Sequence, residues 1–409
     1  MKTILFAPAT FNLGETTRMI EVAKGIQQYH NDKYNCIFFC FSRKYLPLIE
    51  QANFEVHLLT PILSELQGKQ FIEVDQGRSL KFPLTKKEVF QRVRNELALI
   101  NDKNTSLIIT GSNITVFLSA RIAKIPLVFI KPFAMSRPNF SNPNVIPRAF
   151  SGYFFTKKIW ELVRYILLHL QWKPKAFKQV AKEYGLSLPK YSIDLLEGDI
   201  NLITTDSLFL KSATLPANYI KVGAIFSNDE EDLSHTALNF ISKARAEGKK
   251  IVYFAMGSSS NEGLILKVLN YLKTTDYYVI APVKKYLTTP YTPWDRLLLI
   301  DFIQATAVNR LVDIAILHGG EGTIQNACAS GKPFIGIPLQ FEQEQNVSYC
   351  EAFGNAILLP AKKVNSKELQ RCIDSIGNPI FTEKALLMQE LMTKNGVENV
   401  VKWVYSYLN

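Results

Sequence analysis

The stretch HGGEGTIQNACASGKPFIGIPLQFEQEQN, residues 318–346, decides the fold of the second half of this chain. The apolar run directly before it, residues 313–317, predicts a buried parallel strand. Gly319 and Gly320 interrupt that strand, and residues 322–328 predict a helix directly after the glycines. The sequence therefore predicts a strand, a glycine turn and a helix in succession.

Such a turn exposes unpaired backbone N–H groups at the positive end of a helix dipole, where a phosphate group binds readily. Gly319 and Gly320 allow a ligand to approach the backbone closely. His318 and Thr323 add side-chain donors beside those N–H groups. We interpret the turn as the diphosphate site of a nucleotide sugar.

The rest of the stretch continues the same alternation. Residues 331–333 (GKP) end the predicted helix, and residues 334–338 supply the next strand. Glu342, Gln343 and Asn346 are expected on the turn that follows this strand. Their carboxylate and amide groups are suited to binding sugar hydroxyls.

Length and composition are those of a globular protein: 409 residues, of which 47% are hydrophobic and 20% charged. This length favours two domains. The net charge of +11 indicates either a solvated basic surface or contact with an anionic ligand, a membrane or nucleic acid. We expect no nucleic acid partner, because the chain has no basic tail, zinc spacing or Arg/Gly tract.

The five cysteines are scattered and lie mostly in apolar runs, which indicates reduced core thiols. Neither a metal site nor a cofactor is expected. The N-terminal apolar run is too short for a signal peptide, and no later run approaches the ~20 residues that span a bilayer. We therefore expect a cytoplasmic enzyme, with peripheral attachment to a membrane as an added alternative.

The first half alternates strands and helices, which predicts a doubly wound parallel sheet. The expected strands are residues 4–8, 36–41, 56–59, 107–110, 127–130, 202–205 and 219–223. The expected helices are residues 15–29, 42–52, 86–100 and 114–123. The polar, glycine-containing residues 61–83 are expected to form a loop.

Residues 133–190 break this rhythm and predict a helical insert. After a proline-rich loop, residues 155–171 and 174–184 predict helices in which lysines and aromatic residues interleave. One interpretation is a helical subdomain that covers a cleft, with its lysines in solvent. The other is a surface that meets lipid headgroups or a membrane.

The acidic, polar residues 227–234 (SNDEEDLS) are the best linker between two domains. We expect an N-terminal domain of residues 1–226 that binds the acceptor and a C-terminal domain of residues 235–409 that binds the donor, with the last helices packing back on the first domain. The predicted fold class is therefore α/β, with two Rossmann-like doubly wound parallel sheets that face each other across a cleft. Ligands bind such sheets at the carboxyl ends of the strands.

At this point the chain resembles the GT-B glycosyltransferases, specifically the UDP-glycosyltransferase superfamily. The resemblance is strong over the second half and concerns only the layout of the first half. The residues that carry it are Phe302, Ile303, Gln304, His318, Gly319, Gly320, Glu321, Gly322, Thr323, Gly331, Lys332, Pro333, Pro338, Glu342, Gln343 and Asn346. Their combined spacing is far more specific than a lone glycine motif.

The resemblance implies a role for each matching position. Ile303 and Gln304 match the segment that holds the uracil and the ribose. The diphosphate donors are matched by His318, Gly320, Gly322 and Thr323. The pair that grips the hydroxyls of the donor sugar is matched by Glu342 and Gln343, and the loop that borders the phosphates by Ser258 and Ser259. For that serine pair, an ordinary helix N-cap is an equal alternative.

Two departures from the family pattern concern the nucleotide and the catalytic base. The usual ribose-binding acid, eight residues after the histidine, is Asn326 here. The loop that commonly carries a catalytic histidine reads Gly14-Glu15 instead, and the acid that would orient that histidine is replaced by residues 111–113 (GSN). The histidine–acid pair is therefore absent as a unit.

We therefore consider Glu15 as the general base, because a partly buried carboxylate at a helix N-terminus can accept the acceptor proton. The alternative is that Glu15 only complements the helix dipole. The resemblance implies metal-independent, inverting transfer of a sugar from a UDP-sugar to a small-molecule or lipid-linked acceptor. A nucleotide-sugar 2-epimerase of the same fold and a non-catalytic nucleotide-sugar-binding or activator subunit remain the alternatives.

Overall fold

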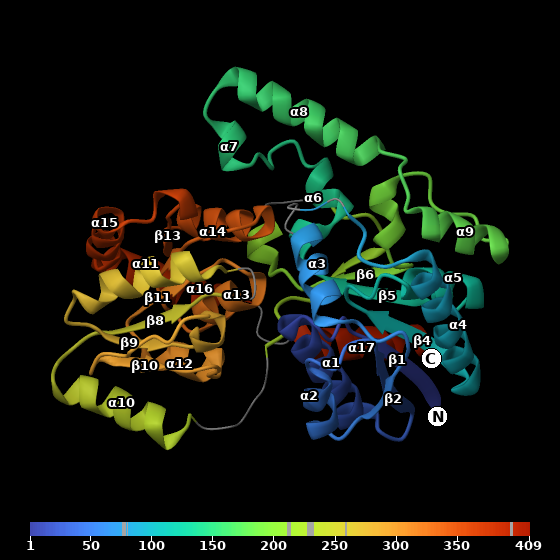
Figure 1. Ribbon diagram of the computed structural model, residues 1–409, viewed down its shortest axis with the longest axis horizontal. Helices are drawn as coiled ribbons and strands as arrows, with labels where there is room; N and C mark the ends of the chain where they lie inside the picture. The colour runs from blue at the N-terminus through green and yellow to red at the C-terminus, as the bar shows by residue number, and fades with distance from the viewer. Residues whose placement is uncertain (76–78, 80, 211–213, 227–232, 258–259, 393–395) are drawn as a thin grey trace. The chain divides into compact units, whose positions relative to one another are not determined.

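The computed structural model describes the chain except for residues 76–78, 80, 211–213, 227–232, 258–259 and 393–395. The chain divides into two compact units (Figure 1). Unit 1 comprises Met1–Thr205, Leu210–Ser227 and Lys394–Asn409, and unit 2 comprises Asp206–Phe209 and Asn228–Thr393. Most of the expected linker, residues 227–234, and the expected donor-site residues Ser258 and Ser259 lie outside the described residues.

Unit 1 is built on a parallel sheet with the strand order β3-β2-β1-β4-β5-β6-β7. The order reverses at β1, which lies between β2 and β4. The strands are β1 (Lys2–Ala7), β2 (Tyr34–Cys40), β3 (Glu55–Leu58), β4 (Thr105–Thr110), β5 (Leu127–Lys131), β6 (Ile200–Ile203) and β7 (Tyr219–Lys221). Such a reversal leaves a crevice at the carboxyl ends of the strands, where ligands bind.

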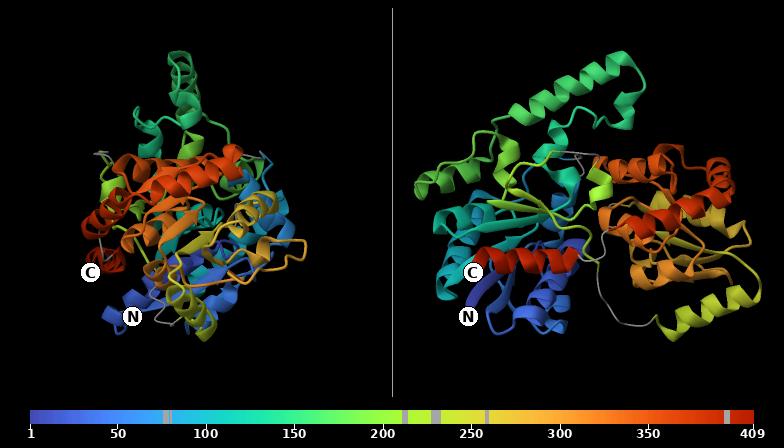
Figure 2. Two further views of the ribbon diagram at one scale, coloured as in Figure 1. Left: turned by 90° about the vertical axis from the view of Figure 1, so that its left-hand side faces the viewer. Right: turned by 180° about the vertical axis from the view of Figure 1, so that it is seen from behind.

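Helices cover both faces of this sheet. The face of α1 packs against the C-terminal helix α17, which returns to unit 1 from the far end of the chain (Figures 1 and 2). The opposite face carries α4 and α5, which pack against each other. The bounds are α1 (Leu13–His30), α2 (Leu46–Gln51), α3 (Glu65–Asp75), α4 (Lys86–Asp102), α5 (Val116–Ala123) and α17 (Gly396–Leu408).

The helical insert of unit 1 consists of α6 (Arg137–Ser141), α7 (Arg148–Ser151), α8 (Phe154–His169) and α9 (Lys175–Glu183). Helix α9 packs on α4 and α5, whereas α8 contacts mainly α6, α7 and the 3₁₀ helix η2 (Ser192–Leu196). In Figure 1, α8 lies apart from the sheet of unit 1. Trp160 is the buried residue of α8, and its indole N–H donates to the Val145 carbonyl at 2.8 Å.

Unit 2 repeats the architecture with the parallel strand order β10-β9-β8-β11-β12-β13. The strands are β8 (Ile251–Ala255), β9 (Tyr278–Ala281), β10 (Leu297–Leu299), β11 (Ile314–Leu317), β12 (Phe334–Gly336) and β13 (Ala356–Leu358). The helices are α10 (His235–Ala246), α11 (Glu262–Lys273), α12 (Ala305–Leu311), α13 (Glu321–Ala329), α14 (Phe341–Phe353), α15 (Ser366–Ile376) and α16 (Pro379–Leu391). Short 3₁₀ helices lie at Phe133–Met135, Ser207–Leu210, Lys284–Tyr286 and Ala361–Lys363.

Three expectations about local structure were wrong. Residues 61–83 are not only a loop, because they contain α3; Gly68 lies inside this helix, where glycine is unfavourable and therefore misleading. Helix α2 starts only at Leu46, with Pro47 in its first turn, rather than at residue 42. Glu342, Gln343 and Asn346 lie on α14 rather than on a turn.

The fold class is confirmed in that the chain contains two Rossmann-like α/β units with parallel sheets. In the described part of the chain, no helix is long and apolar enough to cross a membrane. Among the same residues, no group of three or more His, Cys, Asp or Glu side chains is placed to hold a metal ion.

Candidate active site

The glycine turn of unit 2 joins β11 to α13. Strand β11 lies between β8 and β12, so the turn stands at the carboxyl end of a central strand. Gly319 has φ +93°, a left-handed conformation that favours glycine, and a Cβ at this position would lie only 2.9 Å from the Gln343 carbonyl oxygen. Gly320 is the N-cap of α13 and offers no side-chain cap to the first N–H groups. No side-chain cap therefore competes with a ligand at this end of the helix.

The first turn of α13 is open at Gly322. Gly322 is exposed, and a Cβ at this position would meet nothing within 4 Å. Thr323, one residue later on the same turn, is partly buried. The expected diphosphate donors Gly320, Gly322 and Thr323 thus lie together on one helical turn.

His318 is held between two glycine backbones. A Cβ at Gly257 would lie 2.5 Å from the His318 Nε2 atom, and one at Gly320 would lie 2.6 Å from it. Burial lowers the pKa of His318 to about 4, against the opposing effect of the Ala255 backbone. The buried Nδ1 atom has no hydrogen-bond partner in the described part of the chain. The imidazole is therefore neutral at pH 7 and retains bonding capacity for a ligand.

The expected nucleotide segment lies beside α13. Ile303 and Gln304 are partly buried and lead into α12, for which Gln304 is the N-cap. Asn326 on α13 accepts a hydrogen bond from Thr306 Oγ1 on α12 at 3.1 Å. This bond joins Asn326 to Thr306, which lies two residues after Gln304 in the neighbouring helix. Phe302, directly before this segment, exposes 59% of its surface and offers a flat ring for stacking.

The acid–amide pair of α14 lies under the glycine turn. Asn346 Nδ2 donates to Glu342 Oε1 at 2.7 Å and to the Gly319 carbonyl at 3.1 Å, which ties α14 to the turn. Gln343 is buried and accepts from the Leu339 N–H at 2.9 Å, while its Nε2 donates to Gln340 at 3.1 Å. The Gln343 amide thus stabilises the start of α14.

In unit 1, Glu15 joins the loops that follow β1 and β4. This residue is 5% exposed, and its Oε1 accepts from the Ala9 N–H at 2.6 Å and the Ser112 N–H at 2.8 Å. The Ser112 hydroxyl donates to Glu15 Oε2. Gly111 makes this possible, because a Cβ there would lie 2.2 Å from the Glu15 carboxyl carbon. The two positions at which the family pattern fails are therefore in direct contact.

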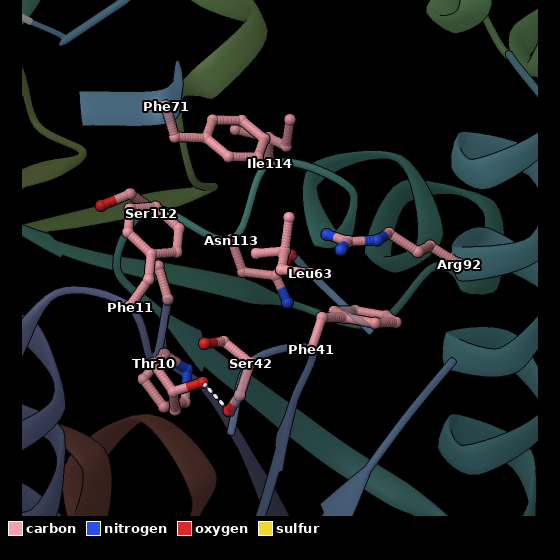
Figure 3. A pocket seen from close by; sticks show the side chains of 12 residues that line it. Thr10, Phe11, Phe41, Ser42, Leu63, Phe71, Arg92, Ser112, Asn113 and Ile114 are labelled. Carbon is pink, nitrogen blue, oxygen red and sulfur yellow. Dashed lines mark hydrogen bonds between the residues drawn. The ribbon is translucent and has the colours of Figure 1, made fainter. Parts of the chain in front are cut away.

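A small pocket with a cavity volume of about 20 Å³ lies beside Ser112 at the same edge of the sheet (Figure 3). Its polar lining comes from Thr10, Ser42, Arg92, Ser112 and Asn113. Its apolar walls come from Phe11, Phe41, Leu63, Phe71 and Ile114, with Pro8 and Ala9 completing the lining. Phe11 and Phe71 stack with their ring centroids 5.5 Å apart. The pocket as it stands has room for about one water molecule.

Helix α4 buries Arg92, which lines the pocket, and Glu96 one turn later. Glu96 is fully buried and accepts from Thr115 Oγ1 at 2.6 Å and Ser119 Oγ at 2.7 Å. Burial raises the pKa of Glu96 to about 7. Burial also lowers the pKa of Arg92 to about 10. Sequence reasoning missed both residues, although charges at positions i and i+4 on the apolar stripe of a helix are a signal.

Comparisons with known proteins bear on both halves. Residues 252–400 match the family described as "Glycosyltransferase family 28 C-terminal domain". The chain is 25% identical over 375 residues to a PGL/p-HBAD biosynthesis rhamnosyltransferase of Mycobacterium bovis, covering 90% of this chain and 79% of the relative. A PGL/p-HBAD biosynthesis glycosyltransferase of Mycobacterium tuberculosis is 23% identical over 379 residues, covering 91% of this chain and 84% of the relative.

Solved structures match the whole chain in fold. The spinosyn forosaminyltransferase SpnP has a TM-score of 0.69 at 11% identity, covering 100% of this chain and 99% of that one. The spinosyn rhamnosyltransferase SpnG complexed with thymidine diphosphate has a TM-score of 0.66 at 13% identity, with complete coverage of both chains. At these identities the likeness concerns the fold.

Proposed function

We propose that this chain, a glycosyltransferase with the GT-B fold of the UDP-glycosyltransferase superfamily, transfers a sugar from a UDP-sugar to an acceptor hydroxyl. The observation that carries the proposal is the turn after β11. There, the open N-terminus of α13, the neutral His318 and Thr323 gather donors around one space suited to a diphosphate.

The chemistry that this turn supports is the departure of a diphosphate. The leaving oxygen gains negative charge as its bond to the anomeric carbon breaks, and preorganised N–H donors stabilise that charge. Backbone N–H groups and an imidazole N–H supply such stabilisation without a metal ion, so we propose metal-independent transfer. The acceptor oxygen attacks the face opposite the leaving group, which inverts the configuration at the anomeric carbon.

We propose that Glu15 is the general base and that it acts through Ser112. Ser112 lines the pocket of unit 1, whereas Glu15 stands behind it and accepts its hydroxyl proton. As the acceptor oxygen bonds to the anomeric carbon, its proton moves to Ser112 Oγ, and the proton of Ser112 moves to Glu15 Oε2. The bond from the sugar to the diphosphate breaks, and UDP leaves. The alternative role of Glu15 is a clamp between the two loops.

The donor nucleotide depends on α12 and α13. Support for a pyrimidine nucleotide comes from Ile303 and Gln304, which lead into α12, and from the hydrogen bond between Thr306 of α12 and Asn326 of α13. An amide at position 326 can bond ribose hydroxyls but carries no charge. One solved relative in fold is complexed with thymidine diphosphate, so dTDP-sugars belong beside UDP-sugars in any test.

We further propose that the acceptor is hydrophobic or lipid-linked and is reached at an anionic membrane surface through the helical insert. Tyr153, Phe154 and Phe155 each expose more than 70% of their surface at the start of α8, and Trp172 exposes 56% beyond its end. Lys157 and Lys158 lie on the same helix. Exposed aromatic side chains beside basic ones are the composition of a helix that lies in a lipid interface.

Product analysis separates the proposed function from its alternatives. The full chain is incubated with UDP-sugars and dTDP-sugars, with and without a panel of hydroxylated acceptors, and nucleotide release is measured. Release that requires an acceptor and yields a glycosylated product supports transfer. Inversion at C2 of the sugar without an acceptor supports a 2-epimerase, and inertness towards every donor supports a non-catalytic subunit.

A further inference from the structure

Glu96 is a buried carboxyl group that the proposed reaction does not use. It lies on α4, and none of its surface is exposed. Thr115 Oγ1 donates to Glu96 Oε1 at 2.6 Å, and Ser119 Oγ donates to Glu96 Oε2 at 2.7 Å. Thr115 is the N-cap of α5, and Ser119 lies within that helix. The carboxyl group therefore ties α4 to the N-terminal part of α5.

The Thr115 hydroxyl lies between two oxygen atoms that both accept its proton. Its Oγ1 atom is 2.6 Å from Glu96 Oε1 and 3.2 Å from Asn113 Oδ1. A hydroxyl group carries one proton and donates it to one acceptor at a time. Both contacts become full hydrogen bonds when Glu96 carries a proton and donates it to Thr115 Oγ1, because the Thr115 proton is then left for Asn113 Oδ1. This geometry favours a protonated Glu96.

Burial and charge act on Glu96 in opposite directions. Burial is the larger effect and raises its pKa to about 7, against the field of Arg92 one turn earlier on α4. Glu88, on the same helix, acts on Arg92. Arg121 on α5 donates to backbone carbonyls of residues 194–197, the face of α9 that packs on α4 is apolar, and β4 has no charged residue. The two protonation states of Glu96 are therefore close in free energy near neutral pH.

Asn113 connects this group to the loop that follows β4. It is 5% exposed, and its amide also acts on the pKa of Glu96. It directly follows Ser112, whose N–H and hydroxyl both donate to Glu15. A chain of side chains thus runs from Glu96 through Thr115 and Asn113 to the residue beside Glu15.

We propose that Glu96 is a positioning residue for sugar transfer, and that its protonated form, acting through Thr115 and Asn113, holds the loop that places Ser112 against Glu15. When Glu96 loses its proton to solvent, the Thr115 hydroxyl donates to the carboxylate and Asn113 Oδ1 loses its donor. The Asn113 amide then turns its N–H groups to the carboxylate, and the adjacent Ser112 moves with it. The role in transfer rests on the proposed function, whereas the link from Glu96 to Asn113 does not.

The first test is the pH dependence of acceptor-dependent UDP release. In the wild type, kcat should fall at least about fivefold between pH 6 and pH 8.5, because Glu96 loses its proton over this range. Glu96→Gln should keep the kcat of the wild type at pH 6 and remove the fall, because a neutral amide donates to Thr115 at either pH. A wild-type kcat that does not fall, or a fall that persists in Glu96→Gln, would overturn the proposal.

Two substitutions of Thr115 separate the hydrogen bonds from packing. Thr115→Val removes the hydroxyl and should lower kcat at pH 6 to the level of the wild type at pH 8.5, with an unchanged KM for the UDP-sugar. Thr115→Ser keeps the hydroxyl and should restore both kcat and its pH dependence. Equal kcat values in the two folded variants would contradict the role of Thr115. If Thr115→Val does not fold by circular dichroism, Glu96→Gln decides.

Ser119→Ala is the matched control. It removes the bond to the other oxygen of the same carboxyl group and leaves the path through Thr115 intact. The variant should therefore retain the fall in kcat, displaced towards higher pH because the carboxylate loses one donor. Loss of the fall in this variant would show that any contact of Glu96 matters equally, against the proposal.

A second test needs no sugar transfer. In the full chain labelled with [15N]asparagine, the side-chain amide signal of Asn113 is assigned by its absence in Asn113→Asp. This signal should shift between pH 6 and pH 8.5 in the wild type and stay fixed in Glu96→Gln. A signal that stays fixed in the wild type would overturn the proposal, even in a chain that transfers sugar. A shifting signal in a chain that releases no nucleotide with any acceptor keeps the link to Asn113 and removes the proposed function.

Discussion

His318 is a neutral imidazole whose environment prevents protonation near pH 7. The ring packs between the Gly257 and Gly320 backbones, and burial lowers its pKa to about 4. A neutral imidazole can donate one N–H to a diphosphate without paying for a buried charge before the ligand arrives. In our account this donor stabilises the leaving group.

Replacement of His318 with alanine should lower kcat/KM for the sugar donor by about 100-fold, the typical effect of removing one donor to a developing anion. Steady-state kinetics with varied UDP-sugar measure this effect. Substitution of the exposed Lys273 on α11 with alanine is the control and should leave kcat/KM unchanged. An unaltered kcat/KM in the His318 variant would remove the histidine from the diphosphate site.

Glu96 shows the opposite displacement, because burial raises its pKa from 4.5 to about 7. The folded state therefore binds a proton more tightly than the unfolded state. Stability from this group is present below pH 4.5 and is lost as the pH rises towards 7. By linkage, the loss has an upper limit of about 3 kcal/mol.

Glu96→Gln removes the titrating group. The free energy of unfolding of the variant minus that of the wild type should be larger at pH 8 than at pH 5. The reason is that a neutral amide carries no charge that has to be buried at pH 8. Urea unfolding at the two pH values measures the difference. The exposed Glu73→Gln on α3 should show no such dependence. A Glu96 variant that behaves like this control would contradict a raised pKa.

At the scale of elements, the turn between β11 and α13 depends on the backbone of one glycine. Gly319 has φ +93°, and a Cβ there would lie 2.9 Å from both the Gln343 carbonyl and Val347 Cγ2 of α14. The close contact with α14 and the left-handed backbone act together. The orientation of the first turn of α13, and with it the donor site, follows from this contact.

Gly319→Ala should cost about 1–3 kcal/mol of stability and weaken UDP binding, because the turn must move to relieve the strain. Gly322→Ala is a matched change in the first turn of α13, where a Cβ would meet nothing within 4 Å, and should stabilise α13 by up to about 1 kcal/mol. Thermal unfolding and UDP titration of both variants provide the measurement. Equal stability of the two variants would exclude the proposed constraint.

The second prediction at the scale of elements concerns helix α8. The full chain should cosediment with vesicles that contain phosphatidylserine and not with pure phosphatidylcholine, and high salt should weaken the binding. The double substitution F154S/F155S should abolish cosedimentation. Leu386→Ser, an exposed apolar residue on α16, should not. Binding that is indifferent to F154S/F155S would exclude α8 as the membrane contact.

Most elements were predictable from the sequence because buried parallel strands are continuous apolar runs between glycine or polar turns. Residues 313–317 and 36–41 illustrate this, since both coincide with strands to within two residues. Helices α3 and α14 were not predicted. Gly68 made the segment of α3 look like a loop. The amides and acids at the start of α14 gave no helical spacing of apolar residues.

The candidate site was predictable where one local stretch carries it and not where distant loops build it. The turn at residues 318–323 could be predicted directly from the spacing of its residues in the sequence. The contact of Glu15 with Ser112 joins positions 97 residues apart and depends on which strands are neighbours. Arg92 and Asn113 come together only because α4 packs beside the loop after β4. No local pattern specifies such a contact.

At the scale of the whole molecule, the account divides the work between the two units. We propose that unit 2 holds the nucleotide sugar through the turn after β11, and that unit 1 holds the acceptor beside Ser112 and removes its proton. Residues of one unit should therefore affect donor binding and residues of the other should affect transfer. This separation is the central claim.

Glu15→Gln tests that claim most directly, since glutamine keeps the size of the side chain and can still accept the Ala9 and Ser112 N–H bonds. The measurement pairs acceptor-dependent UDP release with UDP affinity by titration calorimetry on the same preparation. We predict that release falls at least about 100-fold, as expected for a general base, while the Kd for UDP stays unchanged. Near-normal release in the variant would contradict the account and leave Glu15 as a clamp between loops.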